Sequence, residues 1–335
     1  MSASTALNAP LPATGAAGRP AARLWAGGLL AGAAWIGAAL LIALLPDAIE
    51  VGRTTELAAS AGLIGLALAL GSLAMPLLGA AGARLRRAGP WLTVLPLALA
   101  AWELATAKFA LLPLPFFASP QGLLEVYLED WPRLGESTLR SLWLLLTGYL
   151  LGAAAGFVAG VALGWSRAVG YWVHPVLRLL GPLPATAWLP VAFFVFPTSG
   201  SASTFLVALA TWFPVTVLTW SGVSGVNKAY YDIARTLGAS PTFLVLKVAV
   251  PAALPQVFVG LFMGLGASFS VLVVAEMLGV KAGLGWYLQW AQGWAAYANM
   301  YAALLVMAVM CSSLVTLLFK GRDRLLAWQK GTVRW

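Results

Sequence analysis

The sequence predicts an all-α membrane protein with about eight transmembrane helices. Of its 335 residues, 61% are hydrophobic and only 9% are charged, whereas soluble domains carry about 25% charged residues. Apolar runs near the roughly 20 residues that cross a bilayer as a helix recur along the chain. The one cysteine, Cys311, lies within such a run and excludes an intramolecular disulfide framework.

The apolar runs follow one another at short intervals. The first is longer than the roughly 7–15 apolar residues of a signal peptide, which remains the alternative, so we expect it to be retained as a span. The fifth is the least regular, because Pro182, Pro184 and Pro190 interrupt it. Residues 1–23, small and rich in Ala and Pro, are expected to be a disordered cytosolic tail. The runs are Leu24–Leu45, Leu57–Leu78, Trp91–Leu112, Thr138–Gly164, Val176–Phe196, Thr204–Val223, Gln256–Leu278 and Met300–Phe319.

The basic residues predict the orientation of these spans. With a cytosolic N-terminus, 15 of the 20 Lys and Arg fall on the cytosolic side, including a basic tail at 321–335. Most acidic residues fall outside, among them Asp47, Glu50 and Glu56. The net charge of +9 is therefore explained by membrane topology, and no nucleic-acid partner is expected. Both termini are predicted to be cytosolic.

The longest interior stretch that cannot sit in a bilayer is 226–255, which reads VNKAYYDIARTLGASPTFLVLKVAVPAALP. The pattern predicts a helix over Ala229–Leu237, ended by Gly238 in a left-handed conformation. Ser240 is placed to cap a second helix, with Pro241 at its first position. That second helix is expected to end at Pro251. A helical elbow between two spans, on the cytosolic side, is suited to docking a cytosolic partner.

The spacing in this elbow resembles the "EAA" loop of ATP-binding-cassette (ABC) importer permeases. In that loop an acidic residue, two small residues and three variable ones precede a Gly, and Ile-x-Leu-Pro follows. Here the matching residues are Asp232-Ile233-Ala234, Gly238 and Val248-Ala249-Val250-Pro251. Asp232 stands where the family has Glu, and Ile233 stands where it has the first Ala. Val248 and Val250 stand where the family has Ile and Leu. The wider string ARTLGAS, VPAALP, GLGASFSVLVVAEMLG and GLGW resembles the nitrate/sulfonate/taurine branch, from Trp91 to Phe319.

The resemblance implies a six-helix, type I (MetI-like) permease core at 89–320, with its coupling loop at 226–255. The two helices in 24–88 are an N-terminal addition, for which lipid-facing padding and an extra subunit contact are both open. Implied partners are two ABC ATPase subunits, a second permease copy in a homodimer, and a periplasmic or lipid-anchored solute-binding protein. The implied location is the bacterial inner membrane, surrounded by lipid.

The sequence contains no G-x-x-x-x-G-K-[ST] phosphate loop. We therefore expect ATP and Mg²⁺ to bind to a separate ATPase and this chain to have no catalytic residues. In the resembling family the first helix of the loop lies in a groove of the ATPase. Carried over, that implies Asp232, Ala234, Gly238 and Pro251 as contact or hinge residues, with Arg235 as a further partner for ATPase carboxylates.

Substrate contacts are expected from small polar groups within the spans. Thr211 and Trp212 in the sixth span and Ser268 and Ser270 in the seventh are the candidates, against the alternative that hydroxyls bond their own helix backbone. Glu276 near the outer end of the seventh span is a further candidate for the translocation path. A gating or capping role is favoured for it over direct substrate contact, since a carboxylate would repel an anionic substrate. Nitrate, alkylsulfonates and taurine all remain compatible substrates.

Two further patterns concern packing. Small residues recur every fourth position at Gly152, Gly156, Gly160 and Gly164, and again at Gly260 and Gly264. Such stripes let helices approach closely, and packing within the chain is favoured over a dimer seam. Glu103 is expected to pair with Lys108 or another helix. Residues 120–135 predict one short amphipathic helix on the outer surface.

Two other classes of protein fit the sequence less well. A self-contained secondary transporter or channel is the alternative, but intramembrane relays of Asp, Glu and His and an inverted repeat are missing from the pattern. A membrane-embedded enzyme is disfavoured, because no set of polar residues converges at one depth. His174 is the only histidine, so no metal site is expected.

Overall fold

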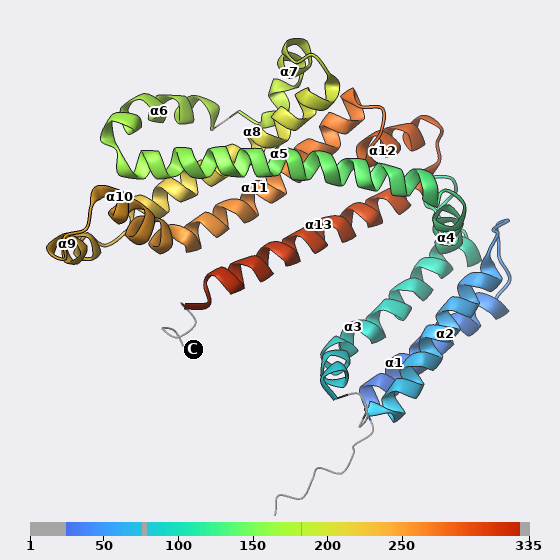
Figure 1. Ribbon diagram of the computed structural model, residues 1–335. Coiled ribbons are helices and arrows are strands. Elements are labelled where there is room, and N and C mark those ends of the chain that lie inside the picture. The colour runs from blue at the N-terminus through green and yellow to red at the C-terminus, as the bar shows by residue number, and fades with distance from the viewer. Residues whose placement is uncertain (1–24, 76–78, 182, 329–335) are drawn as a thin grey trace, which may run out of the picture. The chain divides into compact units, whose positions relative to one another are not determined.

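The computed structural model describes residues 25–75, 79–181 and 183–328 (Figure 1). The expected N-terminal tail and the last residues of the basic tail lie outside these ranges. The described residues form helices joined by short connections, with no strand among them. They fall into two compact units, one made of residues up to 112 together with 119–121, and one made of 113–118 and 122 onward.

Seven helices in the described residues are long and apolar enough to cross a membrane. The fifth expected span, Val176–Phe196, is instead part of a pair of shorter helical segments bent by 90°, Arg167–Leu180 (α6) and Ala185–Val195, the latter comprising η3 and α7. Pro184 and Pro190 explain why this stretch is not one straight helix. The seven are α1 (Ala26–Leu44), α2 (Thr54–Leu73), Ala81–Lys108 within α3 and η2, α5 (Trp131–Trp165), α8 (Ser199–Ser224), Pro241–Gly279 covering α10, η4 and α11, and α13 (Tyr297–Leu325).

The first unit contains α1, α2 and α3 (Gly79–Glu103), and both α2 and α3 pack against α1. α1 and α2 meet where a Cβ added to either Gly32 or Gly65 would lie 2.9 Å from the other's carbonyl oxygen. α3 continues into a π-helical turn, η2 (Leu104–Lys108). The third helix thus packs with the first two. The expected functional boundary between 24–88 and 89–320 stays a prediction.

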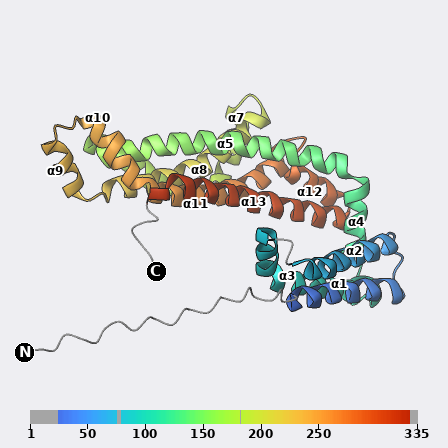
Figure 2. The ribbon, with the colours of Figure 1, turned by 60° about the horizontal axis from the view of Figure 1, so that its bottom comes forward.

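The second unit is organised around α5, α8 and α11 (Val250–Gly279), which lie side by side (Figures 1 and 2). A Cβ added to Gly148 would lie 2.7 Å from the Val207 Cβ, and one added to Gly156 would lie 2.8 Å from the Trp212 carbonyl oxygen. Gly260 of α11 faces α8 in the same way. The glycine stripes therefore pack within the chain, which confirms that prediction.

The opposite end of this unit from α9 and α10 carries α4 (Pro120–Glu129) and α12 (Leu284–Gly293), as Figure 2 shows. Tyr287 is fully buried, and its hydroxyl donates to the Asp130 carboxylate at 2.7 Å. The single amphipathic helix expected over 120–135 is wrong in extent: α4 ends at Glu129 and α5 begins at Trp131. Pro132 lies in the first turn of α5, where its missing N–H costs nothing to the new helix but cannot continue the old one.

Candidate functional site

The elbow between α8 and α11 has the local structure that its sequence predicts. α9 (Lys228–Thr236) begins at Asn227, whose side chain accepts a hydrogen bond from the Ala229 N–H at 3.0 Å. It ends at Gly238, which has φ +81°. Two bonds close the turn, from the Gly238 N–H to the Arg235 carbonyl at 2.9 Å and from the Ala239 N–H to the Ala234 carbonyl at 3.0 Å. This is the Schellman arrangement that ends a helix in a fixed direction.

The second half of the elbow starts as expected but does not stop where expected. The Ser240 hydroxyl oxygen accepts from the Phe243 N–H at 3.3 Å, and Pro241 opens the short helix α10 (Pro241–Phe243). The prediction that this helix ends at Pro251 is wrong, because a π-helical run, η4 (Leu244–Ala249), leads directly into α11. Pro251 then occupies the first turn of α11, a position that proline tolerates.

One face of α9 presents an apolar surface to the outside. Tyr230, Ile233 and Leu237 follow at helical spacing and are 58%, 60% and 82% exposed. Asp232 and Arg235 form an exposed ion pair at 3.5 Å beside them. We call Tyr230, Ile233 and Leu237 the elbow stripe. Three neighbouring exposed apolar side chains on a nine-residue helix are typical of a protein contact.

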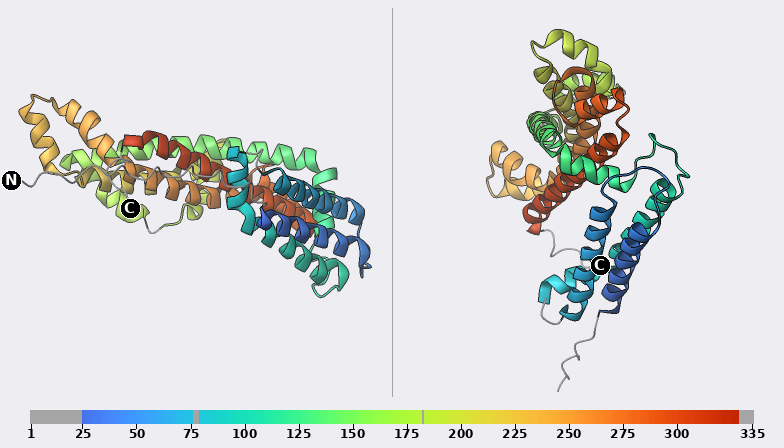
Figure 3. Two further views of the ribbon diagram at one scale, coloured as in Figure 1. Left: turned by 90° about the horizontal axis from the view of Figure 1, so that it is seen from below. Right: turned by 90° about the vertical axis from the view of Figure 1, so that its right-hand side faces the viewer.

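The opposite face of α9 is held by Tyr231. Its ring lies 5.9 Å from the ring of Trp165 at the end of α5, in an edge-to-face contact. Tyr231 also packs on the buried cluster of Val223, Ala249 and Ala253, and burial raises the pKa of its hydroxyl. The elbow is therefore fixed to α5, α8 and the start of α11, while the elbow stripe is left free. Figure 3 shows α9 and α10 extending beyond the end of the helices of this unit.

A pocket of about 550 Å³ opens between α8, α11 and the segment that carries η3 (Ala185–Trp188). Its wall is almost entirely apolar and aromatic, and includes Trp188, Phe213 and Met263. Of the four path candidates other than Glu276, Trp212 and Ser270 line this pocket. Pockets of this size suit a small ligand.

The other two path candidates lie in the helix contacts. The hydroxyls of Thr211 and Ser268 are buried and donate to the carbonyls of Val207 and Leu265, at 2.9 and 3.0 Å. The Ser270 hydroxyl also reaches a carbonyl of its own helix, that of Gly266, at 3.3 Å. The structure therefore separates the four candidates into two at the pocket wall and two within the packing of α8 on α11.

Glu276 is buried and bonded at the far end of α11. Its carboxylate accepts from the Ser141 hydroxyl at 2.7 Å and from the Gly285 N–H at 2.8 Å. Ser141 in turn accepts from the Leu284 N–H at 2.7 Å. The pair occupies the free N–H groups at the start of α12, which is a capping geometry. Sequence reasoning missed Ser141; the Gly283-Leu284-Gly285 run was the available signal, because Gly283 has φ +136°.

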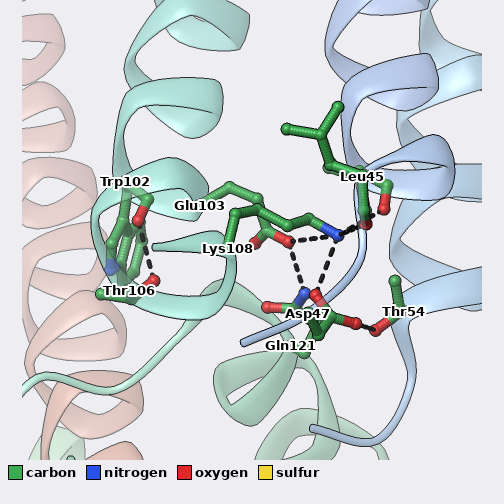
Figure 4. Close-up of polar contacts among 9 residues, drawn as sticks. Leu45, Asp47, Thr54, Trp102, Glu103, Thr106, Lys108 and Gln121 are labelled. Carbon is green, nitrogen blue, oxygen red and sulfur yellow. Dashed lines mark hydrogen bonds and ion pairs between the residues drawn. The ribbon is translucent and has the colours of Figure 1, made fainter. Parts of the chain in front are cut away.

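A polar cluster lies in the first unit, where α1, η2 and the start of α4 meet (Figure 4). The Lys108 ammonium, fully buried, lies 2.8 Å from the Asp47 carboxylate and 3.7 Å from that of Glu103. The expected pairing of Glu103 with Lys108 is present, at the longer distance. The Gln121 amide donates to Glu103 at 2.6 Å. We call Asp47, Glu103, Lys108 and Gln121 the polar node.

The fold defines the class of protein, a multi-pass α-helical membrane protein with a helical elbow between two of its spans. The chain belongs to the family of binding-protein-dependent transport system inner membrane components, whose pattern matches residues 149–327. That range contains the elbow, α8, the pocket and α11. The chain is thus a permease subunit of an ABC importer.

Three relatives show the breadth of this family. The nitrate import permease protein NrtB of Synechococcus elongatus is 28% identical over 257 residues, covering 71% of this chain and 87% of NrtB. SsuC of Bacillus subtilis (strain 168), named for aliphatic sulfonates transport, is 31% identical over 56% of this chain and 68% of its own. The bicarbonate transport system permease protein CmpB of Synechococcus elongatus is 30% identical over 57% of this chain and 66% of its own.

Proposed function

We propose that this permease imports a small oxyanion and is driven by a separate ATPase that docks on the elbow stripe. The observation that carries the docking proposal is the fixed direction of α9. Tyr231 and the Schellman turn hold one face to the membrane helices, and Ile233 and its neighbours face outward. Asp232, Ala234, Arg235 and Gly238 lie in the same helix and its turn, and Pro251 follows where η4 enters α11.

Support for the substrate class comes from the relatives and from the pocket. The relatives are named for nitrate, aliphatic sulfonates and bicarbonate, which are all small oxyanions. The Trp212 indole carries an N–H donor on this mostly apolar wall, while the Ser270 hydroxyl on the same wall already donates to the Gly266 carbonyl. Glu276 is absent from that wall, and its carboxylate is occupied by Ser141 and Gly285. An anion at this wall therefore has the indole N–H as a donor and no carboxylate to repel it.

The remaining partners follow from the same proposal. The elbow and both termini face the cytosol, in line with the distribution of Lys and Arg. Two copies of this chain meet two ATPase subunits, which bind ATP and Mg²⁺, and a solute-binding protein delivers the anion from outside. ATP binding draws the ATPases together, and the elbows move with them. The first two helices are an addition to this core.

The test is co-purification of the tagged chain with the ATPase subunit of its transporter. Ile233→Asp places a charge in the elbow stripe, and Gly238→Val puts a β-branched residue at φ +81°. We expect either change to reduce the bound ATPase at least tenfold while the chain stays monodisperse in detergent. The matched control is Leu325→Asp at the end of α13, since Leu325 is 62% exposed and Ile233 is 60% exposed. Full retention of the ATPase by both elbow variants would refute the docking proposal.

A further inference from the structure

The donors of Lys108 are fully used without Glu103. An ammonium group has three N–H donors. The Lys108 ammonium lies 2.6 Å from the Ile42 carbonyl oxygen, 2.7 Å from that of Leu45 and 2.8 Å from the Asp47 carboxylate. The nearest Glu103 oxygen is 3.7 Å away, beyond hydrogen-bond distance. Glu103 is thus near a cation but receives no hydrogen bond from it.

Two buried oxygens in the polar node have no donor. Glu103 and Gln121 are both fully buried. Within the described residues, Glu103 Oε2 and Gln121 Oε1 have no hydrogen-bond partner. A buried acceptor left unsatisfied is destabilising, and more so if it is charged. These two atoms belong to the two groups that already share the bond from Gln121 Nε2 to Glu103 Oε1, and Figure 4 shows the carboxyl and the amide facing each other.

A single proton satisfies both atoms. A neutral carboxylic acid donates one hydrogen bond and still accepts another. With a proton on Oε2, Glu103 donates to Gln121 Oε1 while its Oε1 accepts from Gln121 Nε2, which closes a two-bond ring. Turning the amide over gives the same ring with the proton on the other oxygen. The 2.6 Å separation is shorter than the roughly 2.7–3.2 Å of N–H···O bonds and lies within the roughly 2.5–3.0 Å of O–H···O bonds.

The charge balance of the polar node favours the same state. The charged or titratable groups that face one another there are Asp47 from the α1–α2 connection, and Glu103 and Lys108 from the end of α3 and η2; Gln121 from α4 is neutral. Asp47 is the more exposed carboxylate, with a side chain 23% exposed, and it also accepts from the Thr54 hydroxyl. Asp47 and Lys108 neutralise each other. A second, fully buried carboxylate would share the single ammonium with Asp47 and leave the polar node with an uncompensated negative charge.

We propose that Glu103 binds a proton in the native protein and forms a carboxylic acid–amide pair with Gln121. The pair is a proton-binding site outside the family-matched residues 149–327. It ties the end of α3 to Gln121 within the first unit. Loss of the proton would place an anion beside the Gln121 carbonyl oxygen and open the pair, so this contact responds to pH.

The experiment is infrared spectroscopy of the full-length chain in lipid nanodiscs at neutral pH. The wild type minus Glu103→Gln difference spectrum is expected to contain a carboxylic-acid C=O band, lost in the variant. Gln121→Leu, of similar size, is expected to shift that band because the acceptor is gone. Asp47→Asn, which removes the carboxylate that we take to be ionised, is the control and is expected to keep it. Absence of the band from the wild-type difference would overturn the proposal.

The pH dependence of thermal unfolding is a second test, which does not require the infrared band to be resolved. A native state that binds one more proton than the unfolded state loses stability as pH rises above about 4.3, the ordinary value for Glu. The thermal unfolding midpoint of the wild type is therefore expected to fall between pH 6 and about 8 relative to Glu103→Gln, with a gap of at least ~2 °C. Parallel pH curves would count against the proton. A midpoint that rises in NaCl but not in choline chloride would overturn it in favour of a bound cation.

Discussion

A polar contact in the first unit, between η2 and the end of α1, differs in kind from the glycine contacts that join α5, α8 and α11 in the second unit. In the first, Lys108 reaches two carbonyl oxygens at the end of α1 and the Asp47 carboxylate after it. In the second, α5 and α11 contact α8 through glycines, and side chains as large as Val207 fill the positions opposite. The contact between η2 and the end of α1 depends on one buried charge. The glycine join is distributed over several turns of backbone contact, so it depends less on any one polar group.

The largest expected effect comes from breaking the polar join. Lys108→Met keeps the length of the side chain but leaves the Asp47 carboxylate and two carbonyl oxygens without their donor. Removing one partner of a buried pair costs about 3–5 kcal/mol. Hydrogen–deuterium exchange is expected to rise in α1 and α3 while α8 stays protected. Equal loss of protection in both units would contradict the independence of the two joins. Lys281→Met, outside the node, is the control.

A smaller effect is expected from breaking the glycine join. The Cβ of Gly152→Leu would meet the backbone carbonyl of Ala208, which cannot rotate away as a side chain does. Overpacking costs about 1–3 kcal/mol, and the exchange pattern is expected to be the reverse of that of Lys108→Met. Gly266→Leu is the matched control within a span, because nothing lies within 4 Å of its Cβ position. Equal unfolding midpoints for the two leucine variants would mean that the close contact at Gly152 does not contribute to stability.

The smallest expected effect concerns a polar contact inside the second unit, where glycine contacts otherwise join the helices. Ser141→Ala leaves the Leu284 N–H unpaired, while Glu276 keeps its bond from Gly285. We expect a loss of about 1–2 kcal/mol, read as a lower thermal unfolding midpoint. Ser313→Ala on α13 is the control, since its exposed hydroxyl bonds only the Val309 carbonyl of its own helix. A Ser141→Ala midpoint equal to that of the control would mean that the cap contributes nothing.

Local patterns in the sequence predicted local structure well. Gly238, Ser240 and Pro241 act within one or two turns of chain, and all three take the expected conformations. The apolar runs predicted the spans, because a helix that crosses a bilayer must be apolar over its whole length. The error at Pro251 has a local cause as well. A π-helical turn directly before the proline allows the helix to continue although Pro251 has no N–H. The sequence contains no pattern that predicts such a turn.

Contacts between distant segments were not predictable in the same way. Ser141 and Glu276 are 135 positions apart, and Gln121 lies 18 positions from Glu103. The glycine spacing indicated that α5 packs closely on something, but not that α8 was the partner. The three-helix packing of the first unit was not visible either, because the third apolar run looks like every other span.

The helical run from Pro241 to Gly279 has 39 residues, which corresponds to a length of about 58 Å. The elbow lies at one end of this run and the Glu276 carboxylate, which holds the start of α12, at the other. Since no loop divides the run, rotation about its axis at the elbow turns Glu276 as well. If the ATPase docks on α9 as proposed, its movement would be transmitted along α11 to Glu276 and so to the start of α12.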